Sequence, residues 1–390
     1  ETINTTDLIR RRWLDNDFYM FNANANYKNE VINFTFGTSY NTYTGNHFGE
    51  IIWARFASDS EIGDQYYNGL GKKKDFSIFS KATYRLNNKI SLFGDLQMRF
   101  VNYKTSGLTS DRVNMLIDEN YNFFNPKAGI TYKLNPENNL YFSYARANRE
   151  PSRSDFESNP NIKPEQLNDF ELGWRHNTKE ALIINTNVYY MLYNEQLVLS
   201  GAIDNTGAPI RTNSGASYRL GLEVEATLQV SKKFAIQPNL TFSSNKNKQT
   251  ISQIDGELVD LGKTNISFSP EFVAANALIY QPVSNLQLSF LSKYVGEQFM
   301  GNTDSEASKL GSYFVNDLNV SYEIKPKSIF KSILVSALVN NIFGEKYVSN
   351  GYYYTYDDTW SDPNQITTIE GAGYYPQATI NFLLGATLKF

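Results

Sequence analysis

The sequence predicts an all-β protein that crosses a membrane as an antiparallel β-barrel. Apolar and polar residues alternate along long stretches, such stretches recur about fifteen times, and short connections alternate with long polar ones. The chain has 390 residues and a mean hydropathy of -0.44, and 15% of its residues are aromatic. It contains no run of the ~18 apolar residues that a transmembrane helix needs.

The alternation is clearest at residues 218–230. One face of this stretch would hold Tyr218, Leu220, Leu222, Val224, Ala226, Leu228 and Val230, and the other Arg219, Gly221, Glu223, Glu225, Thr227 and Gln229. A period of two residues indicates a strand with one apolar and one polar face. We expect the apolar face to meet lipid and the polar face to line a wide interior. A soluble propeller or sandwich would instead bury its apolar faces against other sheets.

The expected strands are much longer than the average of about 5–6 residues in soluble proteins. Many run to roughly 15 residues, which at ~3.3 Å per residue and a tilt of about 45° spans a bilayer core of ~30 Å. We predict strands near residues 13–28, 31–45, 74–87, 88–103, 124–135, 138–150, 165–177, 180–199, 215–230, 233–248, 265–281, 284–300, 310–324, 331–344 and 374–390.

The connections fall into two classes. Short ones, rich in Asn, Pro, Lys and Ser, are expected near residues 28–30, 86–88, 135–138, 177–180, 231–233, 281–285 and 325–328. Long polar ones are expected near residues 46–73, 104–123, 150–164, 200–215, 248–265, 300–310 and 344–373. Short turns on one side and long extracellular loops on the other are typical of outer-membrane barrels.

An odd strand number conflicts with the even numbers usual in bacterial barrels, because an open strand edge cannot be left in lipid. We therefore expect either one miscounted strand or the C-terminal part of a larger barrel. The first residue, Glu1, is not Met, which favours the second interpretation. The last strand carries one more signal. An alternating series ends at the C-terminal aromatic residue and resembles a barrel-assembly signal: Phe382, Leu384, Ala386, Leu388 and Phe390.

Composition argues against several other functions. The chain has no Cys and 2 His, which leaves no cysteine-ligated metal site and disfavours a His-rich one. A net charge of -4 gives no basic surface for nucleic acid. No phosphate-binding loop, dinucleotide fingerprint or nucleophile elbow is present, so we predict neither an enzyme nor a resident cofactor.

Three motifs resemble TonB-dependent outer-membrane receptors. The run NPKAGITY at residues 125–132 resembles the family's NPKxGxxY strand, and IKPE at 162–165 followed by FELG at 170–173 resembles its LKPE…ELG signature. NNIFGEKY at 340–347 resembles the NLFDKxY element before the last strand. The resemblance covers essentially the whole chain, and each motif occurs in the family's order.

This resemblance implies a bacterial outer-membrane location and an expected barrel of 22 strands with a plugged lumen. About fifteen strands would be the last part of that barrel, and the plug domain and the TonB box are not in this sequence. The function implied is active import of a scarce nutrient, a ferric siderophore first, with cobalamin or haem next. The implied partners are outer-membrane lipid and lipopolysaccharide, the N-terminal part with the plug, the TonB complex through that part, and a surface lipoprotein or substrate-binding partner.

Candidate ligand-binding residues lie in the expected long loops. Aromatic residues with polar tips suit ring-containing ligands, and arginines suit anionic ones. We single out Trp53, Tyr66, Tyr67, Arg149, Arg153, Tyr352, Tyr353, Tyr354, Tyr356 and Trp360. The aromatic residues would alternatively form a girdle at the lipid headgroups or pack loop on loop. The arginines would alternatively pair with Asp155, Glu157 or a plug carboxylate.

Some residues have plainer interpretations. His47 could ligate haem, but a single exposed His is more often a surface residue, and Asp357, Asp358 and Asp362 match no known cation-binding loop. Two other functions remain open. A passive porin would be a complete even-stranded barrel, and an adhesion barrel would use the same loops to hold a protein partner.

Overall fold

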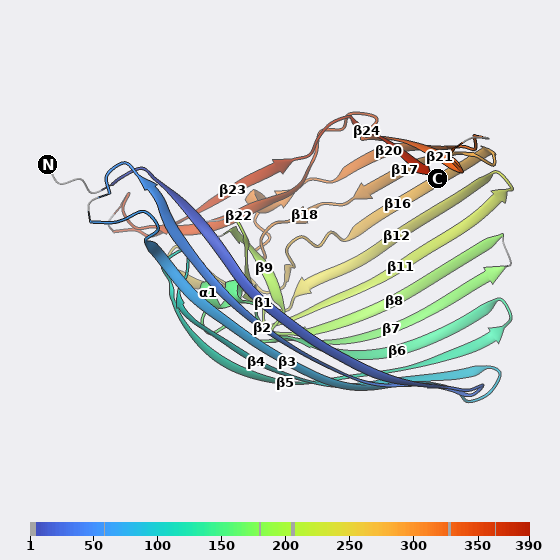
Figure 1. Cartoon of the computed structure of the whole chain (residues 1–390), viewed down its shortest axis with the longest axis horizontal. Coiled ribbons are helices and arrows are strands. Elements are labelled where there is room, and N and C mark those ends of the chain that lie inside the picture. Colours follow the sequence, from blue (N-terminus) through green and yellow to red (C-terminus); the bar gives the residue numbers. More distant parts are fainter. Residues whose placement is uncertain (1–4, 58, 179–180, 204–206, 327–328, 363) are drawn as a thin grey trace. The chain divides into compact units, whose positions relative to one another are not determined.

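The computed structural model describes the chain except for residues 1–4, 58, 179–180, 204–206, 327–328 and 363 (Figure 1). The described residues form 24 strands, one α-helix, α1 (Arg153–Ser158), and a 3-10 turn at Glu306–Ser308. The strands are β1 Leu8–Lys28, β2 Ile32–Ala54, β3 Gln65–Arg85, β4 Ile90–Leu108, β5 Asn114–Asn135, β6 Asn138–Arg149, β7 Glu165–Thr178, β8 Leu182–Asn194, β9 Leu197–Ile203, β10 Pro209–Asn213, β11 Ala216–Ser231, β12 Phe234–Asn247, β13 Ile251–Ile254, β14 Glu257–Asp260, β15 Thr264–Asn265, β16 Phe272–Val283, β17 Leu286–Val295, β18 Gln298–Phe299, β19 Lys309–Leu310, β20 Tyr313–Ile324, β21 Ser332–Asn340, β22 Val348–Asp358, β23 Thr367–Pro376 and β24 Asn381–Lys389. No helix in the described part is long and apolar enough to cross a membrane.

One antiparallel sheet contains the long strands in chain order. Its path is β1-β2-β3-β4-β5-β6-β7-β8-β11-β12-β16-β17-β20-β21-β24, and β15 pairs with β12 beside it. Each of the fifteen predicted strands corresponds to one strand of this path, which confirms the sequence-based reading of the fold. The remaining strands form four two-stranded sheets within the connections: β9-β10, β13-β14, β18-β19 and β22-β23.

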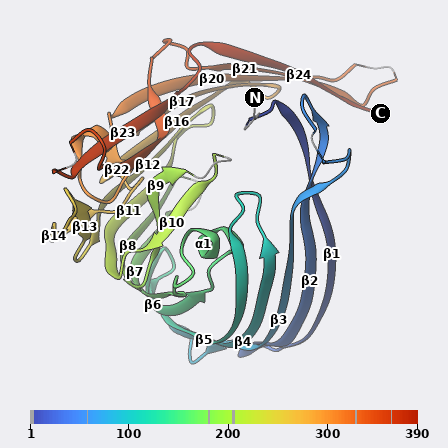
Figure 2. The ribbon, with the colours of Figure 1, turned by 90° about the vertical axis from the view of Figure 1, so that its left-hand side faces the viewer.

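The chain divides into two compact units. Unit 1 holds residues 1–86, 91–128 and 145–166, and unit 2 holds residues 87–90, 129–144 and 167–390. Unit 1 contains β1 to β4, most of β5 and α1, and Figure 2 shows its long strands as neighbouring ribbons. Unit 2 contains β7 to β24 and the small sheets of the later connections.

In unit 2 the two faces of the sheet have the predicted character. On the apolar face of β11, Leu220 and Leu222 remain 44% and 38% exposed. On the polar face, Asn185 of β8 donates a hydrogen bond to Glu225 of β11 at 2.6 Å. Among the described residues no second protein layer covers these leucines, which argues against a soluble sandwich at this strand and leaves the face free to meet hydrocarbon.

Tight cross-strand packing within the sheet depends on glycine. Gly221 of β11 lies opposite Tyr189 of β8. A Cβ at Gly221 would be 2.4 Å from the Tyr189 hydroxyl oxygen and 2.5 Å from the adjoining ring carbon. Glycine therefore leaves the room that lets the buried tyrosine ring lie across the neighbouring strand.

The strands of unit 1 run further than the sequence indicated. β2 continues to Ala54, β3 begins at Gln65, β4 ends at Leu108 and β5 begins at Asn114. The connections expected at 46–73 and 104–123 are therefore largely strand. Alternation predicts a strand only where apolar and polar residues follow one another regularly, and in these extensions apolar residues stand side by side, as in Ile51-Ile52-Trp53 and Met115-Leu116-Ile117.

Two strands of the sheet have a free edge within the described part of the chain. β1 is hydrogen-bonded to β2 alone, and β24 to β21 alone. Every described residue of both strands is exposed. A free backbone edge presents unpaired N–H and C=O groups, which hydrocarbon cannot satisfy.

Candidate functional site

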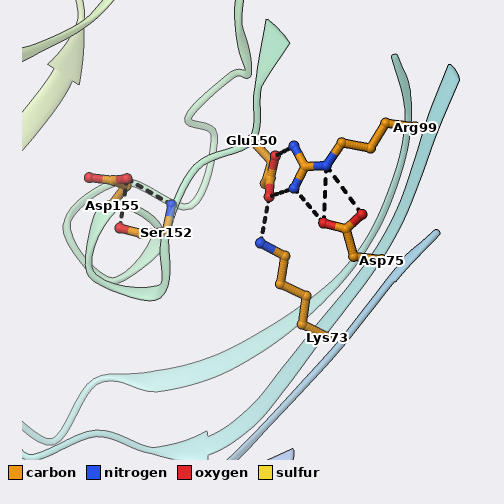
Figure 3. A network of polar contacts seen from close by, with 6 residues as sticks. All are labelled: Lys73, Asp75, Arg99, Glu150, Ser152 and Asp155. Carbon is orange, nitrogen blue, oxygen red and sulfur yellow. Dashed lines mark hydrogen bonds and ion pairs between the residues drawn. The ribbon is translucent and has the colours of Figure 1, made fainter. Parts of the chain in front are cut away.

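A charged network in unit 1 joins two strands to the connection after β6 (Figure 3). Arg99 of β4 donates to both carboxylate oxygens of Glu150, from Nη1 to Oε2 and from Nη2 to Oε1, at 2.8 Å each. The same guanidinium donates from Nε to Asp75 of β3 at 3.0 Å. Lys73 of β3 donates to Glu150 from the other side. Two cations and two anions thus balance within one cluster.

Burial strengthens this network. The side chain of Glu150 is only 8% exposed. Glu150 lies just beyond the end of β6. Burial alone would raise the pKa of Glu150, but hydrogen bonds from Arg99 and Lys73 lower it to about 2. Glu150 is therefore ionised at neutral pH and fixes its connection to the sheet.

The residues after Glu150 are shaped by a capping arrangement. The backbone N–H and the hydroxyl of Ser152 both donate to Oδ2 of Asp155 at 2.7 Å, which starts the six-residue helix α1. Phe156 of that helix stacks on Tyr103 of β4, with ring centres 5.8 Å apart and planes 17° apart. The long polar connection expected at 150–164 is therefore partly helical, and its helix packs against β4. A Ser followed three residues later by an acidic residue is a sequence signal that we could have used.

The two candidate arginines have different surroundings. Arg149 is within 3.3 Å of the Glu165 carboxylate. Arg153 forms no ion pair among the described residues, and its Nη1 is buried without a hydrogen-bond partner. Its guanidinium lies directly on the sheet backbone, because a Cβ at Gly69 would be 2.5 Å from Nη2. No ion pair of Arg153 with Asp155 or Glu157 is found among the described residues, and its pairing with a plug carboxylate stays a prediction.

The aromatic candidates of unit 1 do not form one surface. Tyr66 and Tyr67 pack edge to face with ring centres 5.0 Å apart, and Arg10 lies over the Tyr66 ring at 5.1 Å. Tyr67 is buried, whereas Trp53 is exposed near the end of β2. His47 shares a 3.2 Å hydrogen bond with the Tyr43 hydroxyl. The exposed Trp53 is thus the freer of these rings to meet a ligand.

The candidates of the last long connection lie on the hairpin β22-β23 in unit 2. Tyr352, Tyr354, Tyr356 and Trp360 follow one another as a row of stacked rings. Tyr353 points to the opposite face and is 4% exposed, packed with Met300 and Leu310. The sequence grouped all five residues, but strand alternation separates Tyr353 from the row.

The acidic residues near this row serve the local fold. Asp357 accepts hydrogen bonds from Thr368 and Gln253, at 2.7 and 2.8 Å. Asp358 accepts the backbone N–H groups of Trp360 and Ser361 at 3.1 Å each. Asp362 accepts the backbone N–H of Asn364 at 2.9 Å. In the described residues no group of three or more acidic or histidine side chains is placed to hold a metal ion.

The residues of the expected assembly signal lie on or next to β24. Phe382, Leu384 and Leu388 are exposed on this edge strand, and Phe390 is exposed directly after it. The ring of Phe390 contacts that of Phe330, with ring centres 4.9 Å apart. An exposed terminal aromatic on a free edge fits recognition by an assembly factor, which remains a prediction.

The network of Lys73, Asp75, Arg99 and Glu150 was missed by sequence reasoning. Asp75 and Arg99 lie on neighbouring strands, where Asp75 pairs with Val101 and Arg99 with Ser77, so their side chains meet diagonally. Only the strand register shows this. The signal available in the sequence was charge on the same face of two consecutive predicted strands.

An antiparallel sheet of long strands, polar on one face and apolar on the exposed other face, defines the class of outer-membrane β-barrels. Residues 2–342 match the family model described as TonB dependent receptor-like, beta-barrel. The chain therefore belongs to the TonB-dependent receptor β-barrel family, whose members are located in the bacterial outer membrane. The resemblance drawn from the three sequence motifs is confirmed.

Similar proteins include several metal and metal-chelate receptors. The ferrioxamine receptor of Yersinia enterocolitica is 22% identical over 324 residues, which are 82% of this chain and 43% of that receptor. The siderophore receptor PiuA from Acinetobacter baumannii gives a TM-score of 0.67 at 15% identity, covering 96% of this chain and 56% of its own. The copper transporter OprC gives 0.72 at 15% identity, covering 97% and 57%. The chain thus spans about half the length of these relatives.

Proposed function

We propose that this chain is the barrel part of a receptor that imports an iron chelate, specifically a ferric siderophore, across the outer membrane. The observation that carries the proposal is the two-faced sheet, whose strands from β1 to β21 lie within the residues that match the receptor family. Two of the similar proteins are receptors for siderophores by name. Cobalamin and haem are the alternative cargoes.

Completion of the barrel follows from the free edges of β1 and β24. Each edge needs a further strand before it can lie in lipid. We propose that additional strands of the same receptor pair with these edges and that a plug domain occupies the polar interior. The polar face offers Asn187 and Glu223 of neighbouring strands to such a plug, joined by a 3.4 Å hydrogen bond. TonB would transmit energy through the plug.

Cargo recognition is proposed for the long connections, which we place outside the cell. Arg153 contributes a cation without a carboxylate partner among the described residues, and Trp53 contributes an exposed ring. Arg149, Tyr66 and Tyr67 would shape that region. The aromatic residues Tyr352, Tyr354, Tyr356 and Trp360 of the hairpin β22-β23 would form a second, separate contact surface in unit 2.

The proposal is tested by uptake of radiolabelled iron in cells that carry the complete receptor. Cells lacking other iron-chelate receptors are offered ferric hydroxamate, ferric catecholate and ferric citrate, each with and without TonB. Uptake of at least one chelate that requires TonB supports the proposal. Uptake that persists without TonB would favour the porin, and no receptor-dependent uptake would favour the adhesion barrel. Cyanocobalamin and haem are assayed in parallel to separate the cargoes.

A further inference from the structure

Four aromatic rings form a regular row on one face of the hairpin β22-β23. Ring centres are 6.3 Å apart from Tyr352 to Tyr354, 6.4 Å from Tyr354 to Tyr356 and 5.9 Å from Tyr356 to Trp360. Successive ring planes differ by only 15°, 19° and 5°. Tyr352, Tyr354 and Tyr356 share a face because residues two apart on a strand point the same way, and Trp360, in the connection after β22, stacks on Tyr356 at the end of the row.

The row is accessible along most of its length. Tyr354, Tyr356 and Trp360 are 43%, 42% and 68% exposed, although large aromatic residues usually bury most of their surface. Exposed rings aligned on one strand are costly to leave in water without a partner. The alignment therefore points to a ligand that meets several rings at once.

The hairpin holds the rings in fixed positions. A Cβ at Gly373 would be 2.3 Å from the Tyr352 ring, and a Cβ at Gly371 would be 2.5 Å from the Tyr354 ring, so both rings occupy space that only glycine leaves on β23. On the opposite face Tyr353 packs with the fully buried Met300 and donates to Glu370 at 2.5 Å. A surface whose rings are already ordered loses little entropy on binding.

The negative charge of the hairpin β22-β23 limits which ligands the aromatic row can bind. Asp358 and Asp362 stand in the sequence next to Trp360, Asp357 lies on the opposite face of β22, and no Lys or Arg occurs from Val348 to Pro376. Hydrogen bonds from the Ser361 side chain and from the Ser361 and Trp360 backbone lower the pKa of Asp358, so it stays ionised at neutral pH. This acidic setting repels nucleic acid and anionic chelates. It suits a neutral ligand whose hydroxyl groups donate hydrogen bonds to carboxylates.

We propose that this aromatic row binds a neutral oligosaccharide, with successive sugar rings lying on Tyr354, Tyr356 and Trp360. Sugar rings present flat C–H faces to aromatic side chains and repeat along a chain as the side chains repeat along β22. A single planar ligand would cover one or two rings and leave the rest of the row unused. The sugar chain is either a soluble oligosaccharide or the neutral part of lipopolysaccharide on the same membrane. The inference does not depend on the import of an iron chelate.

The test uses the complete receptor, purified in detergent, with maltose, maltoheptaose, cellohexaose and dextran as probes and isothermal titration as the measurement. We expect at least one of these probes to bind, with affinity rising at least tenfold from the disaccharide to the longer chain, because a longer chain meets more rings. Trp360→Ala and Tyr356→Ala should each weaken binding tenfold or more. Thr355→Ala, on the other face of the same strand, is the matched control and should bind as the unchanged receptor does.

Binding of lipopolysaccharide is measured with and without its sugar chain, which shows whether the ligand is a soluble oligosaccharide or part of the membrane. Binding that requires the sugar chain and is lost in Trp360→Ala supports the inference even when the soluble probes fail. Absence of binding to every saccharide, or binding that Trp360→Ala and Tyr356→Ala leave unchanged, overturns it. A blue shift of Trp360 emission in phospholipid vesicles without any saccharide effect also overturns it, because the row would then be a lipid contact. Heat-dependent gel mobility verifies that each variant is folded.

Discussion

Glu150 receives two parallel hydrogen bonds from the terminal nitrogens of Arg99, each 2.8 Å long. These two hydrogen bonds attach the connection after β6 to β4. The neighbouring Asp75 carboxylate accepts a hydrogen bond from the same guanidinium. The relationship places one cation between two buried anions. Removing that cation therefore tests how much the connection depends on the network.

Arg99→Met should destabilise the receptor by about 3–5 kcal/mol, because two carboxylates would stay in a buried site without their shared cation. The measurement is urea-induced unfolding in detergent, followed by tryptophan fluorescence. Lys104→Met is the control, since Lys104 forms its ion pair with Asp118 on an exposed surface of the same strand. Exposed pairs contribute about 0–1 kcal/mol. Equal losses in the two variants would contradict the assigned burial.

Stability should depend on pH through Glu150. Its pKa is lowered from 4.5 to about 2, so folding favours the ionised form. The resulting stabilisation is complete above pH 4.5 and is lost as the pH falls through about 2. We expect the difference in Tm between the unchanged receptor and Glu150→Gln to be constant near neutral pH and to shrink below 4.5. A difference that stays the same down to pH 2 would show that Glu150 is not the group responsible.

Gly221→Ala should destabilise by about 1–3 kcal/mol, because the added methyl group collides with the buried Tyr189 ring. Gly94→Ala in β4 is the matched control, since a Cβ there meets nothing within 4 Å. That substitution should be neutral or stabilising by up to about 1 kcal/mol, because alanine lowers the conformational entropy of the unfolded chain. Thermal unfolding of both variants in one detergent gives the comparison, and the reverse order would argue against the Gly221–Tyr189 packing.

Leu222→Arg should cost about 2–4 kcal/mol near the middle of the bilayer, because Leu222 is exposed on the apolar face. Thr227→Arg should be mild, since Thr227 lines a hollow on the polar face. Refolding titrations into phospholipid vesicles measure both costs. Similar values at the two positions would mean that the faces were assigned wrongly.

Part of the candidate site was predictable and part was not. The sequence placed Tyr353, Tyr354, Tyr356 and Trp360 together in one long connection, but it did not show that this connection contains a strand, which turns Tyr353 to the other face. Arg153 was predicted as a ligand contact, but the close approach of its guanidinium to Gly69 of β3 could not be read from the sequence. Such contacts join residues far apart in sequence and have no local signature.

The sequence by itself determined the fold class, the order of the fifteen strands and the two faces of each strand, because the period-two pattern depends only on neighbouring residues. It also determined the family, through three short motifs. Only the tertiary structure decided the long extensions of β2 to β5 and the network around Arg99 and Glu150. In the extensions apolar residues stand side by side, which interrupts the period-two pattern. The network exists because strand register and a helix cap bring together charges from three separate parts of the chain.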